Sequence, residues 1–395
     1  MTDKASYYKL FSAYLLALLG TGVAVVALSL LAYELAGEAD APAVIGAALS
    51  IKTLAYVLGA PLAAALTARA ARRPLMIGLD LLRAGALLAL PFASEIWQLY
   101  ALIALFSLAS AAFTPAYQAS VPLLLPEPGD YAQSLARSRI AQEVEGAISP
   151  LVAAALLIAL SPRGLLIATM AAFLLSALLV ARARLPRGAR EGAAVGPVAG
   201  FRILLSAPAL AGLAPLALGV GAATAMITVN TAPLVLGKFG LEGRWAAAAL
   251  AAFGLGAVIG ALMLPRLMAE RGERALMLAG GATMAGALAL SAGVSLYGSL
   301  LALWAVAGFG AAMAQAPAAA LIRRAAPADS RQSVYAANLA LGALASGAGY
   351  AAAGALDVAV SMQVASLVFA GVATVATLVA ALVWPAPGTL RAGAA

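Results

Sequence analysis

The sequence predicts an all-α membrane protein in which twelve transmembrane helices form two parallel six-helix repeats. Three observations lead to this prediction. Hydrophobic residues make up 64% of the 395 residues and charged residues only 10%, whereas a soluble domain is about half apolar and a quarter charged. Long apolar segments recur along the whole chain, and the two halves of the chain share loop motifs.

The composition also excludes several classes of function. The chain has no Cys and no His, so disulfides, thiolate metal sites and histidine chemistry are absent, and we expect no cofactor. The net charge of +8 comes from short basic clusters between apolar segments. Such clusters indicate membrane topology rather than a nucleic-acid partner. No phosphate-binding loop and no dense Asp/Glu cluster is present, which argues against ATP drive and against an enzyme.

The individual spans follow from the length of the apolar segments, because a helix needs about 20 apolar residues to cross the bilayer. The first segment runs to about Ala36. It is longer than the roughly 7–15 apolar residues of a cleaved signal peptide, so we expect an uncleaved helix. Pro, Gly and charged residues mark the later boundaries. The predicted spans are 10–36, 43–68, 75–94, 97–121, 134–160, 164–182, 208–232, 245–268, 275–294, 296–322, 334–356 and 361–384.

The distribution of Lys and Arg predicts the orientation of these spans. Most of the 24 basic residues fall in loops on one side of the membrane, and the loops on the other side hold only Arg163, Lys238 and Arg244. The richer side is cytoplasmic by the positive-inside rule. We therefore expect a multi-pass protein of the cell (inner) membrane with both termini in the cytoplasm. A basic linker, residues 183–205, is expected between the N-terminal half, 1–182, and the C-terminal half, 206–395.

The two halves match each other at a spacing of about 200 residues. "PGDYAQSLARS" at 128–138 corresponds to "PADSRQSVYAA" at 327–337, and Leu75-Met76 corresponds to Leu276-Met277. Alanine-rich membrane helices resemble one another by composition alone, but here the loops carry the match. Equivalent loops lie six spans apart, so the two copies have the same orientation, as in transporters built from parallel repeats.

Two loops and one span connect the chain to a known family. "GAPLAAALTARAARRP" (59–74) and "GALMLPRLMAERGERA" (260–275) resemble the loop motif Gly-x-x-x-Asp-Arg-x-Gly-Arg-Arg of the major facilitator superfamily, although Ala68 replaces its aspartate. "EVEGAISPLVAAA" (143–155) resembles the antiporter motif Gly-x-x-x-Gly-Pro, with Ser149 in place of one glycine. The arginine common in the fourth span of drug–proton antiporters is missing. The basic positions that match the loop motif, or lie in its second copy, are Arg69, Arg72, Arg73, Arg271 and Arg274.

The resemblance covers nearly the full length and implies a secondary transporter that acts by alternating access, usually as a monomer. Within the family, "IKTLAYVLGAP" and "VNTAPLVL" are similar to a branch labelled nickel-resistance permeases. That branch implies export of a divalent metal cation, which is the alternative function. Its members commonly end in a histidine-rich tail, which this chain lacks, and nickel favours imidazole ligands.

Two charges interrupt the third span. Asp80 and Arg83 lie three residues apart on one helix face, where they can pair. A charge in hydrocarbon costs about 2.5–3.5 kcal/mol on the insertion scale. Two charges at this depth therefore indicate a structural or functional role. The pair is a structural clasp between helices, a gate latch that changes partners during transport, or a direct contact to the substrate. Lys52, with Tyr56 one turn later, lies deep in the second span and is expected to line the central cavity unless its ammonium reaches the interface.

The fifth span carries a polar stripe formed by Ser138, Gln142, Glu145 and Ser149. A polar stripe on an apolar helix must face protein or water, and Glu145 is therefore the best candidate for a protonatable cavity residue. Alternatively, Glu145 joins two helices or pairs with Lys52. Other polar residues at helical spacing, which we expect to line the cavity, are Thr114, Tyr117, Thr228 and Asn338.

Together these features predict export of a small organic compound coupled to protons, with the lipid bilayer as the surroundings. A membrane enzyme or a sensor without transport activity is the alternative from a different class. A sensor would usually carry a soluble output domain, and the longest polar segment of this chain is the central linker.

Overall fold

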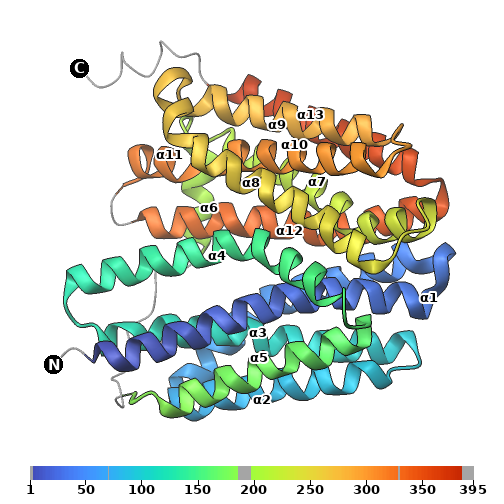
Figure 1. Ribbon diagram of the computed structural model, residues 1–395. Helices are drawn as coiled ribbons and strands as arrows, with labels where there is room; N and C mark the ends of the chain where they lie inside the picture. The colour runs from blue at the N-terminus through green and yellow to red at the C-terminus, as the bar shows by residue number, and fades with distance from the viewer. Residues whose placement is uncertain (1–2, 70, 186–196, 328–329, 385–395) are drawn as a thin grey trace, which may run out of the picture. The chain divides into compact units, whose positions relative to one another are not determined.

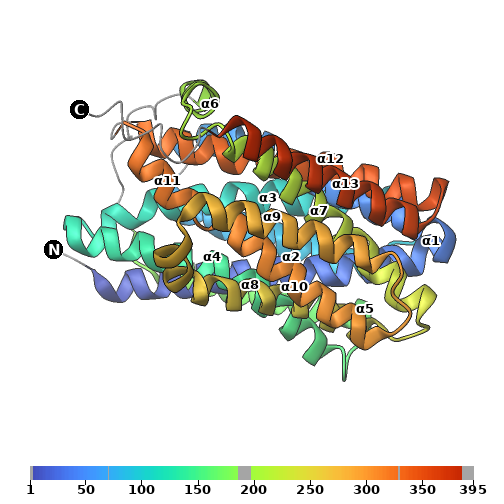
Figure 2. The ribbon, with the colours of Figure 1, turned by 90° about the horizontal axis from the view of Figure 1, so that it is seen from above.

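The computed structural model describes residues 3–69, 71–185, 197–327 and 330–384. Within these ranges the chain is helical, with no β-strand (Figures 1 and 2). The elements are α1 (Lys4–Arg69), α2 (Arg72–Ala89), η1 (Leu90–Phe92), α3 (Ile96–Leu124), α4 (Pro128–Leu156), α5 (Pro162–Arg182), α6 (Pro197–Ser206), α7 (Leu213–Pro233), η2 (Leu234–Lys238), α8 (Gly243–Arg271), α9 (Glu273–Ser291), α10 (Tyr297–Gln315), α11 (Ala318–Ala325), α12 (Arg331–Ala359) and α13 (Met362–Val383).

In the described part of the chain, ten helices are long and apolar enough to cross a membrane. The difference from twelve has two causes. The first two predicted spans are two helices that meet at a non-helical bend at Gly37 (φ 75°, ψ 170°), and together, as α1, they count once. Helix α4 does not count because charged residues such as Asp130 and Glu145 lower its hydropathy. The fold is therefore all-helical with ten to twelve membrane helices.

Two further details differ from the prediction. The predicted span 296–322 is divided near Pro317 into α10 and α11. The predicted linker contains α6, because Phe201 and Leu204 give this segment an apolar face. Leu204 is fully buried in a cluster that also contains Leu213 and Trp384. The sequence "FRILL" carried this signal, but the surrounding Gly, Pro and Arg residues obscured it.

The chain divides into two compact units, Met1–Glu191 with Val235–Ala251, and Gly192–Leu234 with Ala252–Ala395. In the first unit, α1 packs against α3, α4 and α5, and α2 packs against α3 and α5 (Figure 1).

The N-terminal ends of α1 and α4 are joined by an ion pair between Lys4 and Asp130, with Nζ and Oδ2 3.0 Å apart. Asp3 caps α1 by accepting a hydrogen bond from the backbone N–H of Ser6 (2.9 Å), and hydrogen bonding with Ser6 lowers the pKa of its carboxyl group.

In the second unit, α7 packs against α12 and α13, and α9 packs against α10 and α13. Glycines allow α8 and α10 to approach closely. A Cβ atom at Gly308 of α10 would collide with the backbone of Phe253 in α8, and one at Gly256 of α8 would collide with the backbone of Ala305 in α10. Such contacts between small residues are the usual way in which membrane helices pack, because lipid provides no hydrophobic force to bring them together.

Candidate functional site

The first polar cluster contains the two charges of the third predicted span, and both lie in the interior of the first unit. Asp80 is 0% exposed and Arg83 is 1% exposed, and their side chains form the expected ion pair. Ser176 of α5 places its Oγ 2.7 Å from Asp80 Oδ2 and donates to it. The pair thus connects α2 with α5, and a neutral donor satisfies the second carboxylate oxygen.

Arg83 is further held by two aromatic rings. Its guanidinium carbon lies 4.2 Å from the ring centre of Phe113 on α3 and 4.5 Å from that of Phe173 on α5. A cation over an aromatic face is attracted by the ring quadrupole, more strongly in a desolvated site. All these partners belong to the first unit, so the pair joins α2, α3 and α5.

The second cluster is formed by the polar stripe of α4. Gln142 Nε2 donates to the hydroxyl of Tyr14 on α1 (2.7 Å), and the hydroxyls of Tyr117 and Ser138 lie 3.0 Å apart. The rings of Tyr14 and Tyr117 stack with their centroids 4.1 Å apart. The stripe therefore faces α1 and α3, which is the protein-facing orientation that its polarity requires.

Glu145 continues this stripe in a partly buried position. Ser149 Oγ donates to Glu145 Oε1 (3.2 Å), and a Cβ atom at Gly22 of α1 would collide with both side chains. The carboxylate of Glu145 interacts electrostatically with the ammonium of Lys52. The structure thus brings together two charges that are 93 positions apart in the printed sequence, on α1 and α4.

The surroundings of Lys52 connect the two clusters. Lys52 lies beside Ser29 and Ser107 in a narrow gap between α1 and α3. The Oγ of Ser107 is buried and has no hydrogen-bond partner among the described residues. Tyr56, one turn after Lys52, lies near both Ser110 and Arg83. Thr114 is partly buried on α3, one turn before Tyr117.

The basic loop residues have different environments. Arg73 donates from Nη2 to the carbonyl of Ala181 at the end of α5, whereas Arg72 Nη1 is buried and has no hydrogen-bond partner among the residues that the structure describes. Arg274 places its guanidinium carbon 5.7 Å from the ring centre of Trp384, and Arg271 is exposed at the end of α8. The side chain of Arg69 lies outside the described residues.

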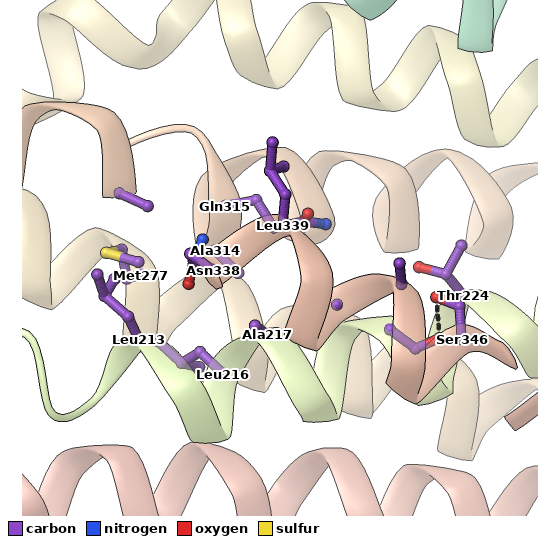
Figure 3. Close-up of a pocket in the computed structure, with 14 residues that line it drawn as sticks. Leu213, Leu216, Ala217, Thr224, Met277, Ala314, Gln315, Asn338, Leu339 and Ser346 are labelled. Carbon is purple, nitrogen blue, oxygen red and sulfur yellow. Dashed lines mark hydrogen bonds between the residues drawn. The ribbon is translucent and has the colours of Figure 1, made fainter. Parts of the chain in front are cut away.

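The second unit contains a cavity of about 200 Å³ lined by residues of α7, α9, α10, α11 and α12 (Figure 3). Asn338 lines this cavity, as expected from the sequence. Thr228 lies one turn beyond the lining residue Thr224 and donates to the carbonyl of Thr224 (2.8 Å). The polar lining side chains are Thr224, Gln315, Asn338 and Ser346.

Several residues of these clusters were not predicted. Phe113 and Phe173 look like ordinary lipid-facing residues in the sequence, and nothing local marks them as partners of Arg83. Ser176 carries a weak signal, as a polar residue within the apolar run "MAAFLLSALL". Tyr14 and Gly22 match no motif. In the part of the chain that is described, no group of three or more His, Cys, Asp or Glu residues lies together.

Comparison with known families decides the wider classification. A family model described as Major Facilitator Superfamily matches residues 10–274 and 216–394. The chain belongs to the Major Facilitator Superfamily. Membership makes the protein a multi-pass membrane transporter of the secondary type, a class whose members are generally not enzymes. The comparison with curated protein sequences gave no match.

Solved structures of Major Facilitator Superfamily transporters have the same fold. A bacterial homologue of the human lysosomal transporter Spinster, inward-facing and occupied, is 13% identical with a TM-score of 0.78, and the match covers 95% of this chain and 96% of that chain. The nucleoside transporter NupG is 14% identical with a TM-score of 0.73, covering 95% and 98%. The POT family transporter PepTSo is 11% identical with a TM-score of 0.73, covering 97% and 98%. At these identities the likeness concerns the fold alone.

Proposed function

We propose that this transporter exports a small organic compound in exchange for protons by alternating access, as a monomer in the cell membrane, with Glu145 as the proton carrier. The observation that supports this proposal most is the environment of Glu145. Its partly buried carboxylate accepts a hydrogen bond from the Ser149 hydroxyl and interacts electrostatically with the ammonium of Lys52.

Protonation of Glu145 would affect more than the charge of this one side chain. Protonation removes the attraction between Glu145 and Lys52 and leaves the ammonium without a counter-charge, in surroundings where charges interact more strongly than in water. Since α1 approaches α4 so closely at Gly22, a change in this ion pair is expected to alter the packing of the two helices. Proton binding is thereby coupled to conformation, which is the requirement for proton-driven transport.

We also propose that the fold consists of two parallel six-helix repeats with both termini cytoplasmic. Equivalent helices of the predicted halves pack in the same pairs: α1 with α4 and α5 corresponds to α7 with α12 and α13, and α2 with α3 and α5 corresponds to α9 with α10 and α13. Parallel repeats of this kind rock against each other around a site near the bilayer midplane. This arrangement supports alternating access.

The proposal is tested in liposomes with an imposed pH gradient and a panel of labelled organic compounds. We expect gradient-driven flux in the wild type and a decrease of about tenfold or more in Glu145→Gln, because glutamine cannot carry the proton. Lys52→Ala is expected to weaken the pH dependence. Glu127→Gln, the same substitution at an exposed position before α4, is the matched control and should retain full flux.

Two results would contradict the proposal. Full gradient-driven transport in both Glu145→Gln and Lys52→Ala would reject the site, and flux in the wild type that does not depend on the pH gradient would reject proton antiport. Uptake of Ni²⁺ by the same vesicles, without transport of any organic compound, would instead favour divalent metal export.

A further inference from the structure

A second pocket of the second unit lies where α8, α11 and α12 meet, and it differs in character from the cavity around Asn338. It has a volume of about 410 Å³ and is lined by Leu264 and Met268 of α8, by residues of α11, and by Arg331 and Tyr335 of α12. The end of α8, helix α11 and the start of α12 lie at the same end of this unit (Figure 1). Ligand pockets usually have volumes of about 300–1,000 Å³, so this pocket is large enough for a ligand.

Two arginines give this pocket, here called the basic pocket, an excess of positive charge. Arg323 on α11 and Arg331 at the start of α12 both line it, and none of its lining residues is acidic. Both arginines are exposed, and neither forms an ion pair with an acidic residue in the described ranges. An anion that enters the basic pocket therefore meets positive charge that no described carboxylate neutralises.

The arginine next to Arg323 in the same helix has a different environment. Arg324 forms an ion pair with Glu273 at the start of α9 and does not line the basic pocket. Arg331 is held along one edge, because its Nε donates to the carbonyl of Ala326 (3.2 Å). Its two Nη atoms donate to no residue that the structure describes. A guanidinium fixed in this way can offer further N–H groups to a phosphate or carboxylate.

The remaining walls of the basic pocket are apolar. They consist of Leu264, Met268 and Ile322 together with small alanines. A free inorganic anion would leave these walls without a partner, whereas a molecule with an anionic head and an apolar body would use both the arginines and the apolar side chains. Anionic lipids have this chemistry, and their headgroups bind in basic pockets between membrane helices on the cytoplasmic side.

We propose that the basic pocket binds an anionic phospholipid, as a bound partner rather than as cargo. The phosphate lies against Arg323 and Arg331, and the glycerol backbone and upper acyl chains lie against Leu264 and Met268. The proposed topology places this end of the unit at the cytoplasmic leaflet, where anionic lipids are found. Binding itself depends neither on that orientation nor on Glu145, so it can be measured in detergent.

Lipid binding is measured on the purified full-length protein in detergent by native mass spectrometry and by the shift of the thermal unfolding midpoint. The probes are phosphatidylglycerol and phosphatidylcholine with identical acyl chains, and inorganic phosphate. We expect phosphatidylglycerol to bind at least about tenfold more tightly than phosphatidylcholine, and more weakly as salt is added. Inorganic phosphate should not displace phosphatidylglycerol, because it makes no contact with the apolar walls.

Variants locate this binding in the basic pocket. Arg323→Gln and Arg331→Gln should each weaken phosphatidylglycerol binding about fivefold, and the double variant about 25-fold. Arg324→Gln is the matched control, because it removes the same charge from the neighbouring position outside the basic pocket. It should bind nearly like the wild type. Met268→Glu places a negative charge in the apolar wall and should weaken binding more than the neutral substitution Met268→Gln.

Several outcomes would overturn the inference. Equal affinity for the two lipids, or unchanged phosphatidylglycerol binding in the double variant, would show that the basic pocket is not a lipid site. Displacement of the lipid by inorganic phosphate would identify a site for a free anion instead. An equal loss in Arg324→Gln would mean that the overall charge of this end of the unit attracts the lipid. The liposome experiment tests a separate claim, since loss of gradient-driven flux with lipid binding retained would reject the proposed function alone.

Discussion

At the scale of single residues, the sequence located the unusual groups but not their partners. Asp80 and Arg83 stand out because charges are rare in membrane spans, and their spacing on one helix predicts the ion pair that the structure contains. Ser176 is 96 residues from Asp80 in the chain, and the two rings around Arg83 come from different helices. Such contacts depend on tertiary packing, about which a local pattern holds no information.

The buried pair leads to a stability prediction. Asp80→Ala leaves Arg83 enclosed by Phe113 and Phe173 without a counter-charge, and breaking a buried ion pair from one side costs about 3–5 kcal/mol. The double variant Asp80→Ala, Arg83→Met removes both charges and should recover part of that loss. The thermal unfolding midpoint in detergent, measured for both variants and the wild type, checks the expected order. A double variant less stable than Asp80→Ala alone would contradict the clasp.

At the scale of helices, boundaries were predictable because their signals are local. The predicted spans 164–182 and 361–384 correspond closely to α5 and α13, since Pro, Ser and charged residues next to long apolar runs mark where a helix leaves the apolar environment. The sequence did not predict that the first two spans are joined by a single bend at Gly37. The segment "GEADAP" suggested a loop, but helix flanks Gly37 on both sides, and this glycine alone absorbs the bend with a positive φ.

Helix contacts in the second unit allow a prediction in which a glycine-to-alanine substitution lowers the stability of the protein instead of raising it. Replacing glycine by alanine inside a helix ordinarily stabilises it by roughly 0.5–1 kcal/mol. Gly308→Ala should instead destabilise the protein, because the added Cβ atom collides with backbone atoms of α8. Gly298→Ala, in the same helix but with no neighbour around the new atom, should be neutral or stabilising. Unfolding midpoints of the two variants check this contrast, and equal midpoints would mean that α8 and α10 are not in close contact.

At the scale of the whole molecule, the family and the helical fold could be predicted because the apolar composition and the loop motifs extend over the full length of the chain. Orientation was predicted from the distribution of basic residues, and it stays a prediction. The sequence predicted polar side chains in the cavity of the second unit but not the shape of this cavity, because that shape arises from five helical elements meeting in space.

The chain has no cysteine, so orientation can be measured without removing native thiols. We expect Ser94→Cys, between η1 and α3, to react with a membrane-impermeant maleimide added outside intact cells. Ser330→Cys, just before α12, should react only after the cells are opened. Labelling of Ser330→Cys in intact cells would place the termini outside and reject the proposed topology. Labelling of both variants in detergent serves as the control for accessibility.

The uncharged walls around Asn338 have a consequence for how such a protein could change over time. None of the described residues that line this pocket is titratable, so a change of pH alters no charge on that lining. Laboratory substitutions in the lining could therefore be selected without disturbing Glu145 and Lys52, the proposed proton-responsive pair of the first unit.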